Sequence, residues 1–411
     1  MVLNYIWIAF FLIAFVIASG KFLFCGDTTV FPTIMDSTFT QAKTAFELSL
    51  GLTGVLSLWM GIMKIGEKGG LVAGLAKLLS PVLCKIFPDV PKGHPAMGTM
   101  FMNFSANMLG LDNAATPMGI KAMEQLQAEN PNKKEASNAQ ILFMVINSSS
   151  VTLIPITILM YRSELGSSNP GLVFLPILFA TCISTFVGFL SVAFVQKINI
   201  FNRVVLAYMG IFIAIISLIC GGFAFLNAEL RNEIASGMGN FIIVMIIFGF
   251  MICGLIRKIN VYDEFIEGAK DGFNIAVSII PYLVAMLVGI ALFRTSGAME
   301  AIIAGIREFC LLLGINADFV PALPTALLKP LSGSGARAMM IETMQTYGAD
   351  SFPAFVSAVV QGSTETTFYV LAVYFGAIKI SNTRHALPCA LLADFAGIVS
   401  AILFSYWFYI G

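Results

Sequence analysis

Charged side chains are scarce in this chain of 411 residues: Asp, Glu, Lys and Arg make up 11% of it, whereas 58% is hydrophobic. Soluble domains carry about a quarter charged residues, so a water-soluble globular fold is excluded. Basic and acidic residues balance at 23 each, and no basic tract suited to nucleic acid occurs. We therefore expect no nucleic-acid partner and predict an all-α polytopic membrane protein surrounded by the lipid bilayer.

Residues that bind metals or act as nucleophiles are also sparse. The seven cysteines form no CxxC pair, and the two histidines, His94 and His385, lie far apart in the chain. Neither a disulfide framework nor a metal site is predicted. No G-x-S-x-G elbow is present, so we do not expect an enzyme, and an intramembrane enzyme remains an alternative without a motif. No cofactor is expected, although a coupling proton or sodium ion is compatible with the buried acids described below.

Apolar runs long enough to cross about 30 Å of hydrocarbon recur along the chain. The clearest occupy residues 4–24, 45–65, 139–161, 172–197, 203–226, 237–256, 273–293, 353–378 and 386–409. Two shorter runs, 70–86 and 298–313, bring the expected total to about 10 or 11 transmembrane helices. Residues 86–138 and 314–352 are rich in Gly, Pro, Asn and Ser, which is typical of broken or re-entrant helices.

Three pairs of segments repeat in the same order. Residues 36–46 match 263–273, Gly61-Ile62 and Gly69 match Gly289-Ile290 and Gly297, and residues 145–152 match 359–366. The sequence therefore predicts two homologous halves. If both short runs cross the membrane, each half crosses five times and the repeat is parallel; if either run is re-entrant, that conclusion fails. The expected domains are a first repeat (1–202), a linker helix and loop (203–236) and a second repeat (237–411).

One polar cluster lies in each half at matching positions. In the second half, Gln361, Ser363, Thr364 and Glu365 interrupt an apolar run, where an ionisable group costs roughly 2.5–3.5 kcal/mol and usually lines a cavity or pathway. The first-half counterpart is residues 147–152, with a proline just beyond. Hydrogen bonding between helices, or a kink covered by its own hydroxyl groups, is the structural alternative.

Each half holds a second cluster. A stretch with several Asn and Asp residues precedes a Thr-Pro pair in the first half, and a Gly-Ser loop between Lys329 and Arg337 lies in the second. Capped turns and a flexible connector explain these equally well. Asp394 is a further acid within an apolar run; with Glu365 it could hold a proton or cation, or it pairs with Arg337 or Lys329. The candidate substrate-binding residues are Gln361, Ser363, Thr364, Glu365, Asn147, Ser148, Ser149, Ser150, Asn103, Asn107, Asp112, Asn113, Ser332, Ser334 and Arg337.

Four motifs resemble a known family. Residues 109–123 (LGLDNAATPMGIKAM) and 146–155 (INSSSVTLIP) resemble spore maturation protein A. Residues 330–336 (PLSGSGA) and 361–374 (QGSTETTFYVLAVY) resemble spore maturation protein B. The chain therefore resembles a fusion of both, within the nucleoside-recognition or gate-domain group of membrane proteins. Each half is then a gate-type repeat, and the bacterial inner membrane is the implied location.

The resemblance implies a role as well. The gate group includes concentrative nucleoside transporters, whose Gly-Gln-Thr-Glu motif is similar to Gln361, Thr364 and Glu365, although two residues intervene here. Asn103 and Ser105 similarly resemble an Asn-Phe-Ser-Ser element of those transporters. The expected function is movement of a small polar solute, nucleoside-like in chemistry, through a site between the two repeats. The alternative is a non-transporting assembly or regulatory protein linked to the envelope or to spore maturation, and a homo-oligomer is compatible with either.

Overall fold

The structure, a computed structural model, describes residues 2–91, 93–226 and 228–410. Within these residues the regular structure is helical, apart from one isolated bridge between Glu135 and Asn382. The helices of the first half and of the linker are α1 (Val2–Cys25), α2 (Val30–Lys68), α3 (Leu71–Ile86), α4 (Pro95–Met108), α5 (Asp112–Glu129), α6 (Asn138–Ser148), α7 (Ile156–Glu164), η1 (Pro170–Val173), α8 (Phe174–Gln196) and α9 (Arg203–Ala224).

The second half continues with a similar order of elements. Its helices are α10 (Ala228–Arg257), α11 (Val261–Thr295), α12 (Ala298–Leu312), η2 (Val320–Ala322), α13 (Leu323–Leu328), α14 (Gly333–Tyr347), α15 (Phe352–Gly362), α16 (Thr367–Ala377), α17 (Ala386–Ser405) and the π-helical end η3 (Tyr406–Ile410). Among the described residues, seven helices are long and apolar enough to cross a membrane: α1, α2, α8, α9, α10, α11 and α17. This confirms an all-α, multi-pass membrane protein.

Four of the expected crossings are either divided into two helices or too short to cross. The run 139–161 is divided into α6 and α7, and the run 353–378 into α15 and α16. Proline at residue 155 cannot donate a backbone hydrogen bond, and the hydroxyl groups near both interruptions compete for backbone carbonyls. The runs 70–86 and 298–313 become α3 with 16 residues and α12 with 15, shorter than the roughly 20 residues a crossing needs.

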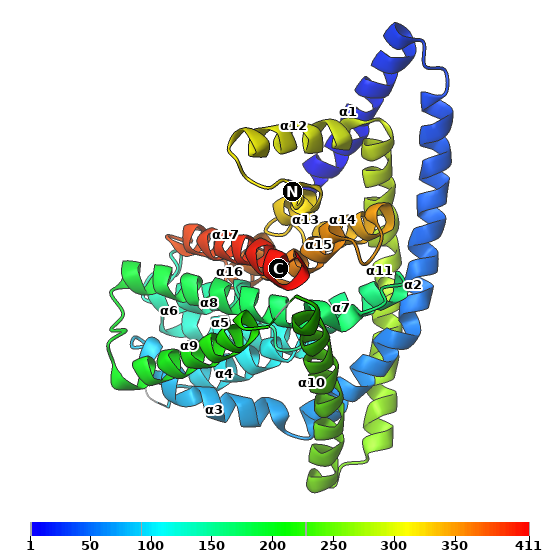
Figure 1. The fold of residues 1–411 in the computed structure, drawn as a ribbon. Coiled ribbons are helices and arrows are strands. Elements are labelled where there is room, and N and C mark those ends of the chain that lie inside the picture. Colours follow the sequence, from blue (N-terminus) through cyan, green and yellow to red (C-terminus); the bar gives the residue numbers. More distant parts are fainter. Residues whose placement is uncertain (1, 92, 227, 411) are drawn as a thin grey trace.

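Equivalent helices of the two halves pack against each other in opposite directions. Helices α2 and α11 lie side by side along one edge (Figure 1), and Ser37 near the start of α2 contacts Thr295 at the end of α11. Gly61, later in α2, contacts Phe265, earlier in α11. This pair is therefore antiparallel.

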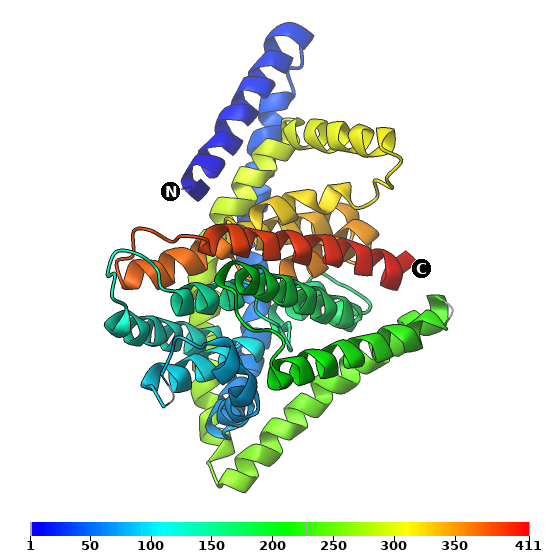
Figure 2. The ribbon, with the colours of Figure 1, turned by 90° about the vertical axis from the view of Figure 1, so that its left-hand side faces the viewer.

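Helices α8 and α17 run across this long pair (Figures 1 and 2) and are antiparallel as well. Gln196 at the end of α8 contacts His385 just before α17, whereas Phe179 near the start of α8 packs on Phe404 near the end of α17. An approximate twofold axis perpendicular to both pairs relates the halves, so the repeat is inverted. The parallel repeat expected from the sequence is wrong, because it required α3 and α12 to be full crossings.

The core that positions the site consists of α4–α8 from the first half and α13–α17 from the second. Pro95 is the first residue of α4, and Ser351 caps the start of α15. Both residue types are favoured at these positions. Glycine at residues 70 and 297 takes a left-handed conformation, which turns the chain sharply into α3 and α12. Helices α9 and α10 project from the core (Figure 2) with largely exposed apolar surfaces, which suits contact with lipid.

Candidate functional site

Four interruptions of helical structure meet inside the core, two from each half. In the first half the α4–α5 hairpin tip touches the break between α6 and α7, where the Leu153 amide donates to the Met108 carbonyl at 2.9 Å. In the second half the α13–α14 tip touches the break between α15 and α16, where the Phe368 amide donates to the Pro330 carbonyl at 3.0 Å. Backbone groups freed by each break are thus paired by the neighbouring tip.

The two breaks also bond to each other. The Glu365 amide donates to the carbonyl of Ser148 at 2.9 Å, across the interface between the halves. Thr185 of α8 donates its hydroxyl to the carbonyl of Ser149 at 2.5 Å. The clusters that the sequence placed at matching positions are therefore neighbours in space.

A network of amides and one phenol lies beside this contact. The Asn147 Oδ1 accepts from Asn107 Nδ2 at 2.6 Å and from the Tyr374 hydroxyl at 3.2 Å. Asn103 Nδ2 donates to the same Tyr374 hydroxyl at 3.1 Å, and Asn147 Nδ2 donates to the Phe143 carbonyl at 2.8 Å. Each bond except the last links two different helices, so the network fixes α4, α6 and α16 relative to one another.

A cavity of about 180 Å³ adjoins this network. Its walls are Asn107, Thr116, Asn147, Glu365, Tyr369, Val370, Val373 and Tyr374. It offers a carboxylate, two amides and hydroxyl groups, which can hold a solute that carries hydroxyl or amine groups. Drug-sized pockets have about 300–1,000 Å³, so this shape suits a small polar solute, and a nucleoside needs the walls to move apart.

Of the residues named from the sequence, Asn107, Asn147 and Glu365 line this cavity. Asn103 lies behind it, fully buried, with one amide oxygen that no described group bonds. Asp112 and Asn113 begin α5, and their side chains lie outside the described residues.

The serines of the first-half cluster use their hydroxyl groups locally. Those of Ser148 and Ser149 both donate to the Val145 carbonyl, at 3.1 and 2.9 Å. Ser150 lines a separate apolar cavity of about 260 Å³ between α3, α8 and α9. These serines shape the end of α6, and their backbone rather than their hydroxyl groups reaches the other half.

Three second-half candidates do not line the cavity. Ser332 caps α14 by accepting from the Gly335 amide at 3.0 Å, and its hydroxyl group lies 3.3 Å from that of Ser334. Arg337 lies over the Tyr161 ring at 5.9 Å, near α2 and α11.

The last three candidates belong to the second-half break. Ser363 donates its hydroxyl to the Val360 carbonyl at 2.8 Å. Gln361 is 7% exposed, and no described group bonds its amide oxygen. Thr364 faces Asp394 on α17. None of the three lines the cavity that Glu365 enters.

Tyr374 is a central residue that the sequence reasoning did not single out. It stacks on Phe143 with ring centroids 5.6 Å apart. A Cβ at Gly119 of α5 would lie 2.2 Å from the Tyr374 hydroxyl oxygen, so glycine there permits the contact. An aromatic residue within an apolar helix carries no local signal for such a role, because its partners are distant in the chain.

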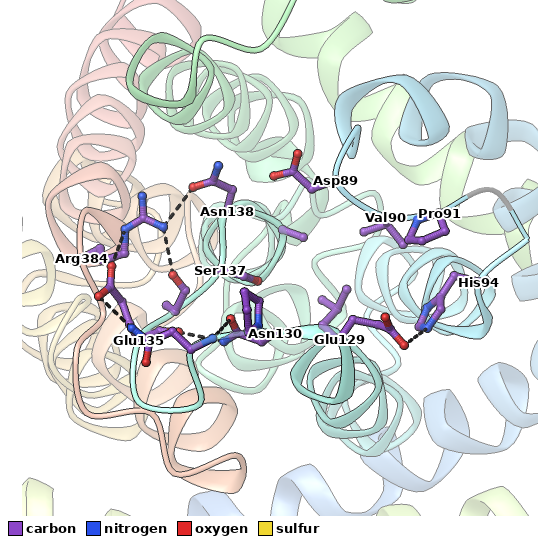
Figure 3. A pocket seen from close by; sticks show the side chains of 15 residues that line it. Asp89, Val90, Pro91, His94, Glu129, Asn130, Glu135, Ser137, Asn138 and Arg384 are labelled. Carbon is purple, nitrogen blue, oxygen red and sulfur yellow. Dashed lines mark hydrogen bonds and ion pairs between the residues drawn. The ribbon is translucent and has the colours of Figure 1, made fainter.

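The two ends of the core carry related pairs of loops. At one end, Arg384 before α17 pairs with Glu135 at 3.3 Å and donates to Asn138 Oδ1 at 3.1 Å. These residues border an open pocket of about 410 Å³ (Figure 3), whose opposite wall includes His94 and Glu129, 3.7 Å apart. Loop residues and the ends of α5 and α6 form this pocket, and the charged residues at its border are separate from the polar cavity at Glu365.

At the other end, Arg162 after α7 pairs with Asp350 at 3.0 Å. Burial raises the pKa of Asp350, but hydrogen bonds from Ser167 and Ser168 and the charge of Arg162 outweigh this and hold the pKa below its ordinary value. Each end is therefore closed by an arginine of one half and an acid of the other. In the residues that the structure covers, no group of three or more His, Cys, Asp and Glu could hold a metal ion.

Comparisons with known proteins agree with this geometry. The nucleoside-recognition (Gate) family model matches residues 49–168 and 276–381, one range in each half. Spore maturation protein B of Bacillus subtilis (strain 168) is 44% identical over 171 residues, which cover 42% of this chain and 94% of that protein. Spore maturation protein A of the same organism is 41% identical over 181 residues, 44% of this chain and 89% of that protein.

Each relative thus accounts for less than half of the chain, as a fusion of the two would. No solved structure matches the chain. Two family matches, two half-length relatives and two inverted halves lead to one conclusion. The chain belongs to the nucleoside-recognition, or gate, family of membrane proteins.

Proposed function

We propose that this protein transports a small polar solute across the bacterial inner membrane, through the cavity bounded by Asn107, Asn147 and Glu365. One observation carries the proposal: the breaks of two inverted halves place a carboxylate and two amides in one cavity. Inverted repeats with discontinuous helices support alternating access to a site at the repeat interface. A nucleoside-like solute is the first class to test, because the chain belongs to the nucleoside-recognition family.

Uptake into vesicles that contain the purified full-length protein tests this proposal directly. Labelled nucleosides and other small hydroxylated solutes serve as probes. We expect Glu365→Gln and Asn147→Ala each to lower uptake by about tenfold or more, since a charge-assisted hydrogen bond is worth roughly 1.5–3 kcal/mol. Glu308→Gln, at an exposed acid of α12, is the matched control and should leave uptake unchanged. Full uptake by both cavity variants would overturn the site.

A second function has an observation in its favour. Asn107, Asn147 and Tyr374 bond one another, as side chains that only hold helices together do. A non-transporting protein that assembles with or regulates others would have such a network. It predicts that Glu365→Gln lowers the unfolding temperature, while no tested solute raises that of the parent protein.

A further inference from the structure

An acid on α17 lies buried behind the cavity. Asp394 is 2% exposed, in the middle of α17. Within the described residues, neither of its carboxylate oxygens has a hydrogen bond of ordinary geometry, although the Thr364 and Thr367 hydroxyl groups lie near them. A buried charge that lacks well-formed hydrogen bonds is strongly unfavourable, so a further group that balances this carboxylate is expected.

Two hydroxyl groups nearby are in the same condition. Thr364 and Thr367 are 3% and 0% exposed, and neither hydroxyl oxygen has a hydrogen bond of ordinary geometry among the described residues. Both face the Asp394 carboxylate. Thr364 approaches α17 closely because residue 397 is glycine: a Cβ there would lie 2.6 Å from Thr364 Cγ2. Asp394, Thr364 and Thr367 together are called the Asp394 cage below.

The charged groups around the cage determine the charge of a ligand that it can bind. The buried Lys329, at the end of α13, attracts the Asp394 carboxylate, and Glu365 repels it. Helix α8, which packs along α17, contributes the Ser184 hydroxyl, donated to the Ala393 carbonyl at 2.9 Å. Two acids and one lysine leave a single net negative charge. One monovalent cation neutralises it, and oxygen donors suit a hard cation.

We propose that the Asp394 cage binds one small monovalent cation, either sodium or a proton. Thr364 faces the cage and its neighbour Glu365 lines the cavity, so one loop of the second-half break serves both sites. A cation that orders this loop also orders Glu365, and binding at the two sites is thereby coupled. The coupling rests on the proposed transport function, whereas the cation site does not.

Thermal unfolding of the purified full chain in detergent tests the cage. The midpoint is measured in sodium chloride and in choline chloride of equal ionic strength, each at about pH 8 and about pH 6. If sodium is the ligand, it raises the midpoint at the higher pH by about 2 °C or more. If a proton is the ligand, lowering the pH in choline chloride raises the midpoint of the parent protein by a similar amount relative to that of the Asp394→Asn variant. In either case Asp394→Asn abolishes the response.

Further variants keep the test interpretable. Thr364→Val preserves side-chain volume and removes one oxygen from the cage, so we expect it to weaken the response even if Asp394→Asn fails to fold. Thr343→Val, at a buried threonine that donates to the Met339 carbonyl, is the matched control and should keep the full response. A parent protein that responds to neither cation, or a response that survives in Asp394→Asn and Thr364→Val, would overturn the cage.

The outcomes separate the cage from transport. A sodium or proton response that depends on Asp394, in a protein that moves none of the tested solutes, upholds the cage and counts against transport. Uptake that is indifferent to sodium, to pH and to Asp394→Asn upholds transport and overturns the cage.

Discussion

The two halves of this protein share a backbone plan but differ in their chemistry. Each half interrupts one helix at the centre of the core and covers the interruption with a hairpin tip. The first-half break offers Asn147 and serines that bond their own helix, whereas the second-half break offers Glu365 with Asp394 behind it. The inverted repeat gives both halves the same scaffold, and among the side chains that the structure describes the acids at the interface between the breaks come from the second half.

The ends of the core differ in the same way. Arg162 has 1% of its side chain exposed and donates to Asp350, to the Ala349 carbonyl and to Ser167. Arg384, its counterpart, has 35% exposed and pairs with Glu135. One end is therefore fixed by a buried guanidinium and the other by a surface ion pair, although both join the halves.

The largest expected effect comes from removing these arginines one at a time. Arg162→Met leaves the buried Ala349 carbonyl and the partly buried Asp350 and Ser167 without this donor, and should lower the free energy of unfolding by about 2–4 kcal/mol. Arg384→Met should lower it by less than about 1 kcal/mol, because exposed ion pairs contribute little. Denaturant unfolding of both variants measures the difference. Equal losses would show that the two ends are equivalent.

A smaller effect is expected where the halves touch at the phenol network. Gly119→Ala places a methyl group against the Tyr374 hydroxyl and should cost about 1–3 kcal/mol. Gly98→Ala in α4 is the control, since nothing lies within 4 Å of a Cβ there. Unfolding midpoints of the two variants decide the point: if they match, Tyr374 is not packed as described.

The smallest effect is a difference in pH response between the two ends. Burial and then the charge of Arg384 lower the pKa of His385 below its ordinary value, and its ring lies 3.0 Å from the Gln196 side-chain nitrogen. His385 therefore binds a proton more readily in the unfolded chain than in the folded protein. The Arg384 end consequently loses stability as pH falls through about 6.5.

The pKa of Asp350 is also lowered. Because an acid is charged when it has lost its proton, this lowered pKa stabilises the folded protein, whereas the lowered pKa of His385 destabilises it at low pH. Its contribution to stability is present above about pH 3.9 and is lost only as pH falls below that value. Amide hydrogen exchange, expressed as protection relative to the intrinsic rate at each pH, should therefore show lower protection around residues 381–386 at about pH 5.5 than at about pH 7.5, and little change around residues 349–351. An equal loss of protection at both ends would contradict these assignments.

Parts of this fold are predictable from the sequence and parts are not. The excess of apolar residues indicates membrane helices, and Pro155 after a serine cluster marks a break, because both effects are local. The inversion depends on whether two short helices cross, which their length leaves undecided. The contact of Asn147 with Tyr374 spans 227 positions, and the isolation of Asp394 follows from packing of α15–α17, so neither has a local signature.

The bonds that cross between the halves also set the order of events during synthesis. Asn107 and Asn147 emerge from the ribosome long before Tyr374, the partner whose hydroxyl completes their network. The first half therefore enters the bilayer with Asn107 and Asn147 bonded to each other but without the Tyr374 hydroxyl, and polar groups that lack part of their hydrogen bonds in hydrocarbon are costly. Because α9 and α10 tether the two halves, the second half is present at a high effective concentration. Fusion in one chain therefore shortens the time before Tyr374 bonds to the first-half break.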